Sequence, residues 1–303
     1  MRARIKVGTT TWAGRGLVAT GWYPRDVKTS EERLHYYASQ FPIVENEAGY
    51  YAILTPEQVA LWADRTPDGF TMNMKAHALF TAHYADPRRL PRDVVEALPR
   101  GVRAKPHVYP RDLSVATMRD LERRFRDALL PLHEAGKLGV VLFQFPMWFV
   151  ISREHKAELS RLRESFAPYR VAVELRNKTW LSEENRDETL AHLRKEDIAY
   201  CCVDEVGPIP PIAAATADIA VVRMHGRNAS RFKGRRSLPE GARYVYTQAE
   251  LREWVPRIRE LAKHAREVHV LFNNAVADYA VRGAHDLVEL LEGARGVTLA
   301  KAG

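Results

Sequence analysis

Residues 139–176 read GVVLFQFPMWFVISREHKAELSRLRESFAPYRVAVELR, and this stretch decides the fold class. Its two ends, 139–145 and 170–175, have the length and the Val, Leu and Phe content of buried strands. Between them, Ser152 is a helix N-cap residue, and apolar side chains follow at helical spacing: Leu159, Leu162 and Phe166. A strand, a helix and a second buried strand form the unit from which parallel sheets are built.

Six further apolar or β-branched runs repeat this unit along the chain: 4–8, 43–47, 70–75, 198–204, 219–225 and 267–273. Most connections are helical and begin at N-cap residues: Thr29 with Glu32, Thr55 with Gln58, Thr247 with Glu250, Ser114 and Ser182. The Pro-rich connection 205–218 has no helical pattern. Eight units in 303 residues predict an α/β fold, a single TIM (βα)8 barrel spanning 1–303 as one domain. Neither Gly-x-Gly-x-x-Gly nor a Walker A loop is present, which disfavours an open nucleotide-binding sheet.

Composition excludes several classes of protein. The 46 basic and 38 acidic side chains give a net charge of +8, and 46% of the residues are hydrophobic, which excludes a disordered chain. No apolar run is long enough to span a membrane, so no membrane contact is predicted. The start of the chain, MRARIKVG, enters a strand without a signal-peptide core, so we expect a cytoplasmic protein. The adjacent Cys201 and Cys202 point to opposite faces of a strand and are interpreted as packing residues.

Two stretches exceed a minimal barrel, at about 81–113 after the third strand and 226–246 after the seventh. The second is a basic loop whose cations are Arg227, Arg231, Lys233, Arg235 and Arg236. Aromatic residues are interleaved with these cations, as in surfaces that bind single-stranded nucleic acid or flat anionic ligands. A solvated loop without a ligand explains the same pattern, and both interpretations stay open.

Polar residues follow the apolar part of most strands, where barrel enzymes place their active sites. Acid/base chemistry is predicted for four of them: Glu45, Glu174, Asp204 and His225. Binding of a substrate is predicted for six others: Lys75, Gln144, Arg176, Arg223, Asn273 and Asn274. The alternative is an ion-pair network that only closes the end of the barrel. No His-x-His or His-Glu-x-x-His spacing occurs, so no cofactor is predicted, although a divalent metal stays an alternative.

Several motifs in matching order resemble the YecE-like family of uncharacterised proteins, also known as DUF72. They include Gly8-Thr9-Thr10-Thr11-Trp12, Leu142-Phe143-Gln144-Phe145-Pro146, Ala172-Val173-Glu174-Leu175-Arg176, Arg223-Met224-His225-Gly226 and Phe272-Asn273-Asn274. The resemblance covers nearly the whole chain and implies a (βα)8 barrel without a settled activity. It adds Trp12 to the candidate substrate-binding residues.

Three functions remain in competition. The first is a hydrolase or lyase acting on a phosphorylated or other anionic substrate, of which a nuclease-like phosphodiesterase is one form. The second is a non-catalytic protein that binds nucleic acid or an anionic ligand through the basic loop. The third is a glycoside hydrolase with paired carboxylates. The sequence leaves protein partners open, and a monomer is expected rather than an obligate oligomer.

Overall fold

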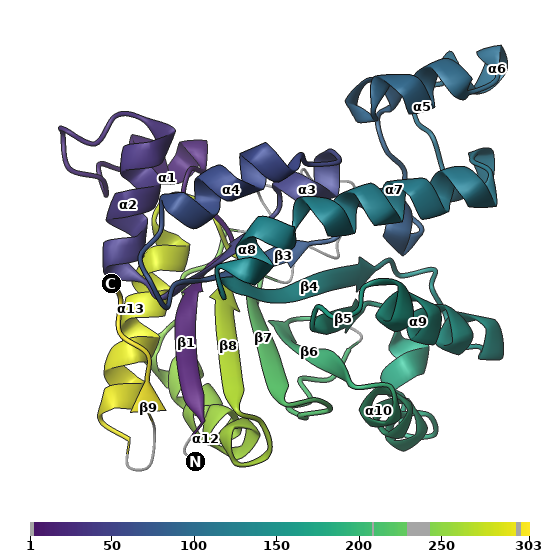
Figure 1. The fold of residues 1–303 in the computed structure, drawn as a ribbon. Helices are drawn as coiled ribbons and strands as arrows, with labels where there is room; N and C mark the ends of the chain where they lie inside the picture. Colours follow the sequence, from purple (N-terminus) through teal and green to yellow (C-terminus); the bar gives the residue numbers. More distant parts are fainter. Residues whose placement is uncertain (1–2, 208, 229–242, 295–297) are drawn as a thin grey trace.

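The computed structural model describes residues 3–207, 209–228, 243–294 and 298–303, and its centre is a closed barrel of parallel strands (Figure 1). The strands are β1 (Arg4–Thr9), β2 (Ile43–Asn46), β3 (Thr71–Lys75), β4 (Leu138–Phe145), β5 (Val171–Leu175), β6 (Ile198–Glu205), β7 (Ile219–Gly226) and β8 (Glu267–Phe272). The ring closes because β1 pairs with both β8 and β2. A short β9 (Thr298–Leu299) also pairs with the start of β1. The predicted TIM-barrel fold class is confirmed.

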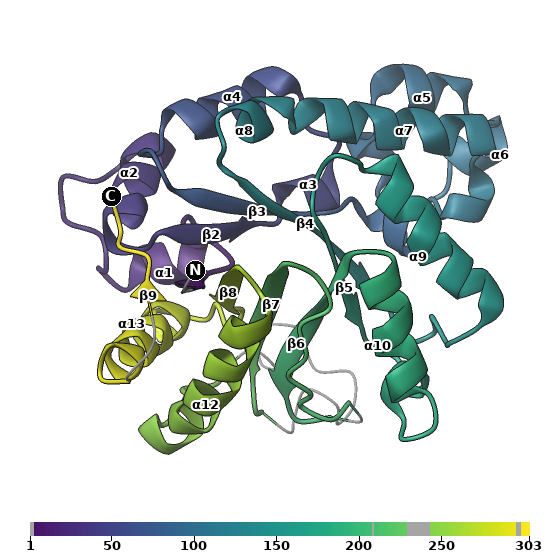
Figure 2. The ribbon, with the colours of Figure 1, turned by 60° about the horizontal axis from the view of Figure 1, so that its bottom comes forward.

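The helices lie outside the ring of strands, as Figure 2 shows. They are α1 (Arg15–Ala19), α2 (Ser30–Gln40), α3 (Ala48–Tyr51), α4 (Pro56–Asp64), α7 (Val115–Ala128), α8 (Leu130–Glu134), α9 (Arg153–Ser165), α10 (Arg186–Lys195), α12 (Gln248–His264) and α13 (Tyr279–Glu292). All three predicted capping boxes form, at Thr29, Thr55 and Thr247. The predicted start at Ser182 is wrong, since the N-cap of α10 is Asn185. The Ser182 carbonyl instead accepts a turn hydrogen bond from the Asn185 N–H, 3.1 Å away.

The extended loop after β3 contains two short helices, α5 (Arg92–Ala97) and α6 (Arg100–Arg103), which project beyond α7 (Figure 1). Its two sides are joined by paired backbone hydrogen bonds of 2.9 Å between Ala85 and Val108. In the extended loop after β7, Arg231, Lys233, Arg235 and Arg236 lie outside the described residues. Within the part of the chain that is described, no helix has the length and apolar content needed to cross a bilayer.

Polar side chains also fill the end of the barrel where the strands begin. His269 is fully buried, and its Nδ1 lies 3.0 Å from the Asn73 Oδ1. Burial lowers the pKa of His269 to about 4, which keeps the imidazole neutral at pH 7. The Asn73 Oδ1 also accepts the Val140 N–H at 3.1 Å. Gly139 leaves room for this amide, because a Cβ there would lie 2.1 Å from the Asn73 Oδ1.

We therefore expect Gly139→Ala to destabilise the protein by about 1–3 kcal/mol, because the added methyl group overpacks the barrel and displaces the Asn73 amide. Urea unfolding measures this loss. Gly101→Ala in α6 is the matched control, since a Cβ there meets nothing within 4 Å. Equal stability of the two variants would contradict the proposed close contact.

Candidate functional site

A fully buried arginine joins the polar strand ends into one network. The Arg223 guanidinium, on β7, donates through Nη1 to the Glu174 Oε2 and through Nη2 to the Glu45 Oε1, both at 2.6 Å. All three side chains are at most 1% exposed. The same Nη2 lies 3.3 Å from the Glu47 Oε1. Carboxylates from β2, from the N-cap of α3 and from β5 are therefore gathered around one cation.

Two further cations lie at the edge of this network. The Lys75 Nζ donates to the Glu47 Oε1 at 3.1 Å. The Arg176 Nη2 donates to the Glu205 Oε2 at 3.2 Å, and its Nε lies 3.3 Å from the Glu174 Oε1. The Arg176 and Glu47 side chains are 24% and 29% exposed, so the network reaches solvent on this side. An anion entering the barrel mouth would therefore meet Arg176 and Glu47 before the buried members of the network.

Four carboxylates face three cations in this network. The acids are Glu45, Glu47, Glu174 and Glu205, and the bases are Lys75, Arg176 and Arg223. Among the described residues these acids outnumber these bases by one, so the carboxylates differ in how strongly their ionised forms are stabilised.

The carboxylate pKa values separate accordingly. Burial raises the pKa of Glu45, and the neighbouring Glu47 charge adds to this rise against the pull of Arg223. Burial alone would raise the pKa of Glu174, but His225, Arg223 and Arg176 hold it well below its usual range. Lys75 and Arg223 similarly lower the pKa of Glu47 against its burial. Of Glu45, Glu47 and Glu174, only Glu45 has a raised pKa, and its Oε2 has no hydrogen-bond partner among the described residues.

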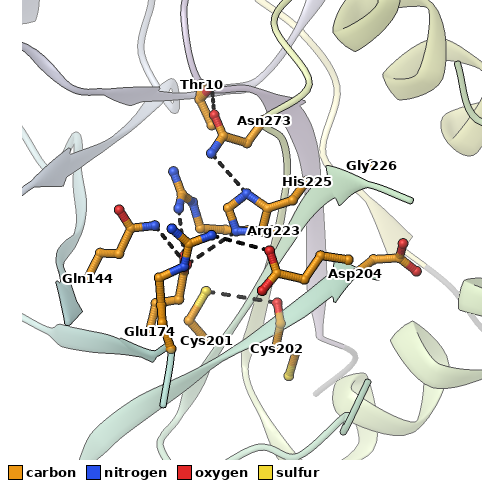
Figure 3. Close-up of polar contacts among 12 residues, drawn as sticks. Thr10, Gln144, Glu174, Cys201, Cys202, Asp204, Arg223, His225, Gly226 and Asn273 are labelled. Carbon is orange, nitrogen blue, oxygen red and sulfur yellow. Dashed lines mark hydrogen bonds and ion pairs between the residues drawn. The ribbon is translucent and has the colours of Figure 1, made fainter. Parts of the chain in front are cut away.

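A hydrogen-bond chain orients His225 beside Glu174 (Figure 3). The Thr10 Oγ1 donates to the Asn273 Oδ1 at 2.8 Å, so the Asn273 Nδ2 faces the His225 Nδ1 at 3.1 Å. The His225 Nε2 then lies 3.3 Å from the Glu174 Oε1. Burial lowers the pKa of His225 despite the attraction of Glu174, so the ring is a neutral Nε2–H tautomer.

Asp204 does not join this network, although its position at a strand end predicts it. It points away from Glu174 (Figure 3), and its carboxylate accepts hydrogen bonds from Arg227, Tyr246 and Trp254. The register between β6 and β7 shifts between Asp204 and Glu205, and Glu205 faces Arg176 instead. Arg227, the first cation of the basic loop, is therefore paired with Asp204.

The other predicted binding residues divide into two groups. Gln144 belongs to the network, because its Nε2 donates to the Glu174 Oε1 at 2.7 Å. Asn274 instead donates to the Tyr244 carbonyl at 2.7 Å and fixes the end of the loop after β7. Trp12 packs edge-on against Trp62, with ring centroids 6.2 Å apart, and belongs to the hydrophobic core. Three members of the site were not predicted from the sequence: Glu47, Glu205 and Thr10. Glu47 could have been predicted, because it lies two residues after Glu45 and so points to the same face of the strand.

The described residues contain no group of three or more His, Cys, Asp and Glu side chains with the geometry to hold a metal ion. The carboxylates of the site point at guanidinium, ammonium and amide nitrogens. The chemistry that this arrangement can support is anion binding at Arg176, which borders solvent, with the buried Lys75 adding positive charge, and proton transfer on the carboxylates.

Known proteins resemble this chain over nearly its full length. The family model described as "Protein of unknown function DUF72" matches residues 6–302. The "UPF0759 protein YunF" of Bacillus subtilis is 29% identical over 301 residues, which cover 95% of each chain. A DUF72 family protein of Thermotoga maritima has a crystal structure with a TM-score of 0.74 and 27% identity, covering 95% of this chain and 99% of its own. One from Enterococcus faecalis has a TM-score of 0.75 at 24% identity over 96% of both chains, which supports the fold alone.

Removal of the central cation tests the network. We expect Arg223→Met to destabilise the protein by about 3–5 kcal/mol, because Glu45 loses the cation that it contacts and Glu174 keeps only Arg176 as a charged partner, at 3.3 Å. Their pKa values in the folded variant then lie above the unfolded value of about 4.3, so stability is retained below that pH and lost as the pH rises. Chemical unfolding at pH 5 and pH 8 measures this dependence.

Arg227→Met is the matched control, since Arg227 is 22% exposed and one of its partners, Glu253, is 48% exposed. A smaller loss is expected there. Adding Glu45→Gln and Glu174→Gln to Arg223→Met is expected to restore much of the stability at pH 8. A loss in Arg223→Met that does not depend on pH would contradict the charge balance described here.

Proposed function

The chain belongs to the DUF72 family, and from this premise we propose that it is an enzyme, a hydrolase or lyase acting on a phosphorylated or other anionic substrate at the carboxyl ends of the barrel strands. The observation that carries the proposal is the pairing of Glu45 and Glu47 on one guanidinium nitrogen, the Arg223 Nη2, at 2.6 and 3.3 Å. Two carboxylates on one guanidinium nitrogen interact electrostatically, and their titrations are coupled.

The two members of this pair differ in access. Glu45 is completely buried, whereas the Glu47 side chain is 29% exposed and borders solvent. In the proposed mechanism Glu47 contacts the substrate and removes a proton from it as general base. When Glu47 gains this proton its negative charge is lost, and the pKa of the neighbouring Glu45 falls in response. Lys75 and Arg176 bind the anionic group and stabilise negative charge that develops during the reaction.

Glu174 acts as a positioning residue in this proposal. Its oxygens accept from Arg223 and Gln144, and it lies within 3.3 Å of Arg176 and His225. A carboxylate held ionised by so many donors is a poor general acid. This weakens a glycoside hydrolase mechanism in which Glu174 is the carboxyl group that donates the proton. The acid/base roles suggested for Glu174 and His225 by sequence become orienting roles.

The second candidate, a non-catalytic binder of nucleic acid, receives less support. Arg227 is bound by Asp204 and Glu253, so this cation of the basic loop is already neutralised. The remaining cations of that loop lie outside the described residues.

A panel of phosphomonoesters, phosphodiesters and other anionic esters tests the proposal. For any compound that is turned over, we expect Glu47→Gln to lower kcat by about 10²–10⁴, the usual contribution of a general base. Arg176→Ala is expected chiefly to raise KM, because that residue binds the anion. Glu267→Gln, at the opposite end of the barrel, is the control and is expected to retain wild-type kcat.

Wild-type kcat in Glu47→Gln would remove the acid/base assignment. If the protein binds inorganic phosphate but turns over no compound on the panel, the enzymatic proposal fails and an anion-binding role remains.

A further inference from the structure

Aromatic side chains from three loops gather at one side of the barrel mouth. Tyr50 lies in α3 after β2, His83 in the extended loop after β3, and Trp148 in the loop after β4. The ring centroids of Tyr50 and His83 are 5.8 Å apart, and those of His83 and Trp148 are 5.7 Å apart. The rings thus form a continuous series from solvent toward the barrel.

The inner end of this series touches the charged network. The Lys75 Nζ lies over the Tyr50 ring, 4.4 Å from its centroid, while donating to Glu47. Burial, with the charges of Lys75 and Arg176, lowers the pKa of His83 to about 4. His83 is therefore a neutral ring close to the two cations assigned to the anion.

The outer end is an exposed tryptophan on a fixed backbone. Trp148 is 63% exposed, although the turn that carries it is hydrogen-bonded on both sides. The Asn177 side chain donates to the Met147 carbonyl, and the Trp180 Nε1 donates to the Phe149 carbonyl at 2.7 Å. These bonds hold the backbone of the turn in place. Met147 and Val150 of the same turn are also exposed, so the turn presents several neighbouring apolar side chains to solvent, as binding surfaces do.

A cavity of about 500 Å³ opens beside this ring, lined by Ala82, Tyr109, Pro110, Arg111 and Trp148. That volume is within the range of small-molecule sites. The Arg111 guanidinium stacks over the Tyr109 ring at 4.8 Å. Tyr109 is itself fixed, because its N–H donates to the Asp112 Oδ2 at 2.9 Å. The cavity combines flat aromatic faces with a planar cation.

We infer that this cavity binds a planar ring of the substrate against Trp148, with Arg111 facing the ring or a substituent on it. The inference rests on the proposed function and narrows it: the substrate is an anion that carries an aromatic or heteroaromatic ring, as a nucleotide does. Stacked rings and Arg are suited to such a ligand, because every base presents a π face. Binding energy from this non-reacting part would position the anionic group at Lys75 and Arg176.

Calorimetric titration with three probes tests the inference: adenosine 5′-monophosphate, ribose 5-phosphate and adenosine. The monophosphate is expected to bind about tenfold or more tightly than ribose 5-phosphate, a difference of about 1.4 kcal/mol. Trp148→Ala is expected to abolish this advantage while leaving ribose 5-phosphate affinity unchanged, and Trp148→Phe is expected to keep part of it. Leu130→Ala is the control, because Leu130 is 44% exposed on α8, away from the cavity.

The outcomes separate the two proposals. Equal affinity of wild type and Trp148→Ala for the monophosphate and for adenosine would overturn the ring site and leave the anion site standing. Adenosine binding that depends on Trp148, without any binding of ribose 5-phosphate, would support the ring site and overturn the proposed function. No binding of any probe would overturn the inference.

Discussion

The site depends on one buried cation, the Arg223 guanidinium. Its environment would be prohibitively costly for an unpaired charge, and only the carboxylates around it make that position stable. Glu45 and Glu174 in turn are buried only because Arg223 is between them. The three side chains come from β2, β5 and β7, so the ion pairs form only when the barrel has closed with the correct register. The ion pairs of Arg223 with Glu45 and Glu174 therefore both stabilise the closed barrel and hold the site together.

The two ends of the barrel show why a polar interior does not by itself indicate a function. Where the strands begin, Lys6 donates to the Thr71 Oγ1 at 2.5 Å and lies 3.5 Å from Glu267, which is also 3.2 Å from His269. This cluster contains a carboxylate, an ammonium and an imidazole, as the opposite end does. The difference among the described residues lies in charge balance: where the strands begin, Glu267 faces Arg4, Lys6 and Arg170, whereas at the strand ends four carboxylates face three cations.

The sequence predicts the barrel well because strand and helix periods depend on local residue types. The capping boxes at Thr29, Thr55 and Thr247 show this. Side-chain parity also brings Glu45, Lys75, Glu174 and Arg176 together correctly. It fails for Asp204, because Glu205 shares the strand parity of Cys201, which lies beside Glu174, whereas Asp204 shares the parity of Cys202, which faces away. The sequence alone does not show which parity of β6 faces the interior of the barrel.

Net charge does not locate the proposed anion site. Three cations of the loop after β3 are bound to nearby acids, as Arg88 is to Asp86, Arg92 to Glu96 and Lys105 to Asp112. Exposed pairs of this kind contribute little stability and leave little field for a ligand. Lys75 and Arg176 differ because, in the described part of the chain, their partners belong to a network of four acids and three bases. An incoming anion there must compete with carboxylates, so binding is favoured when one of them takes up a proton. Substrate binding and proton uptake would then be coupled at the same few residues.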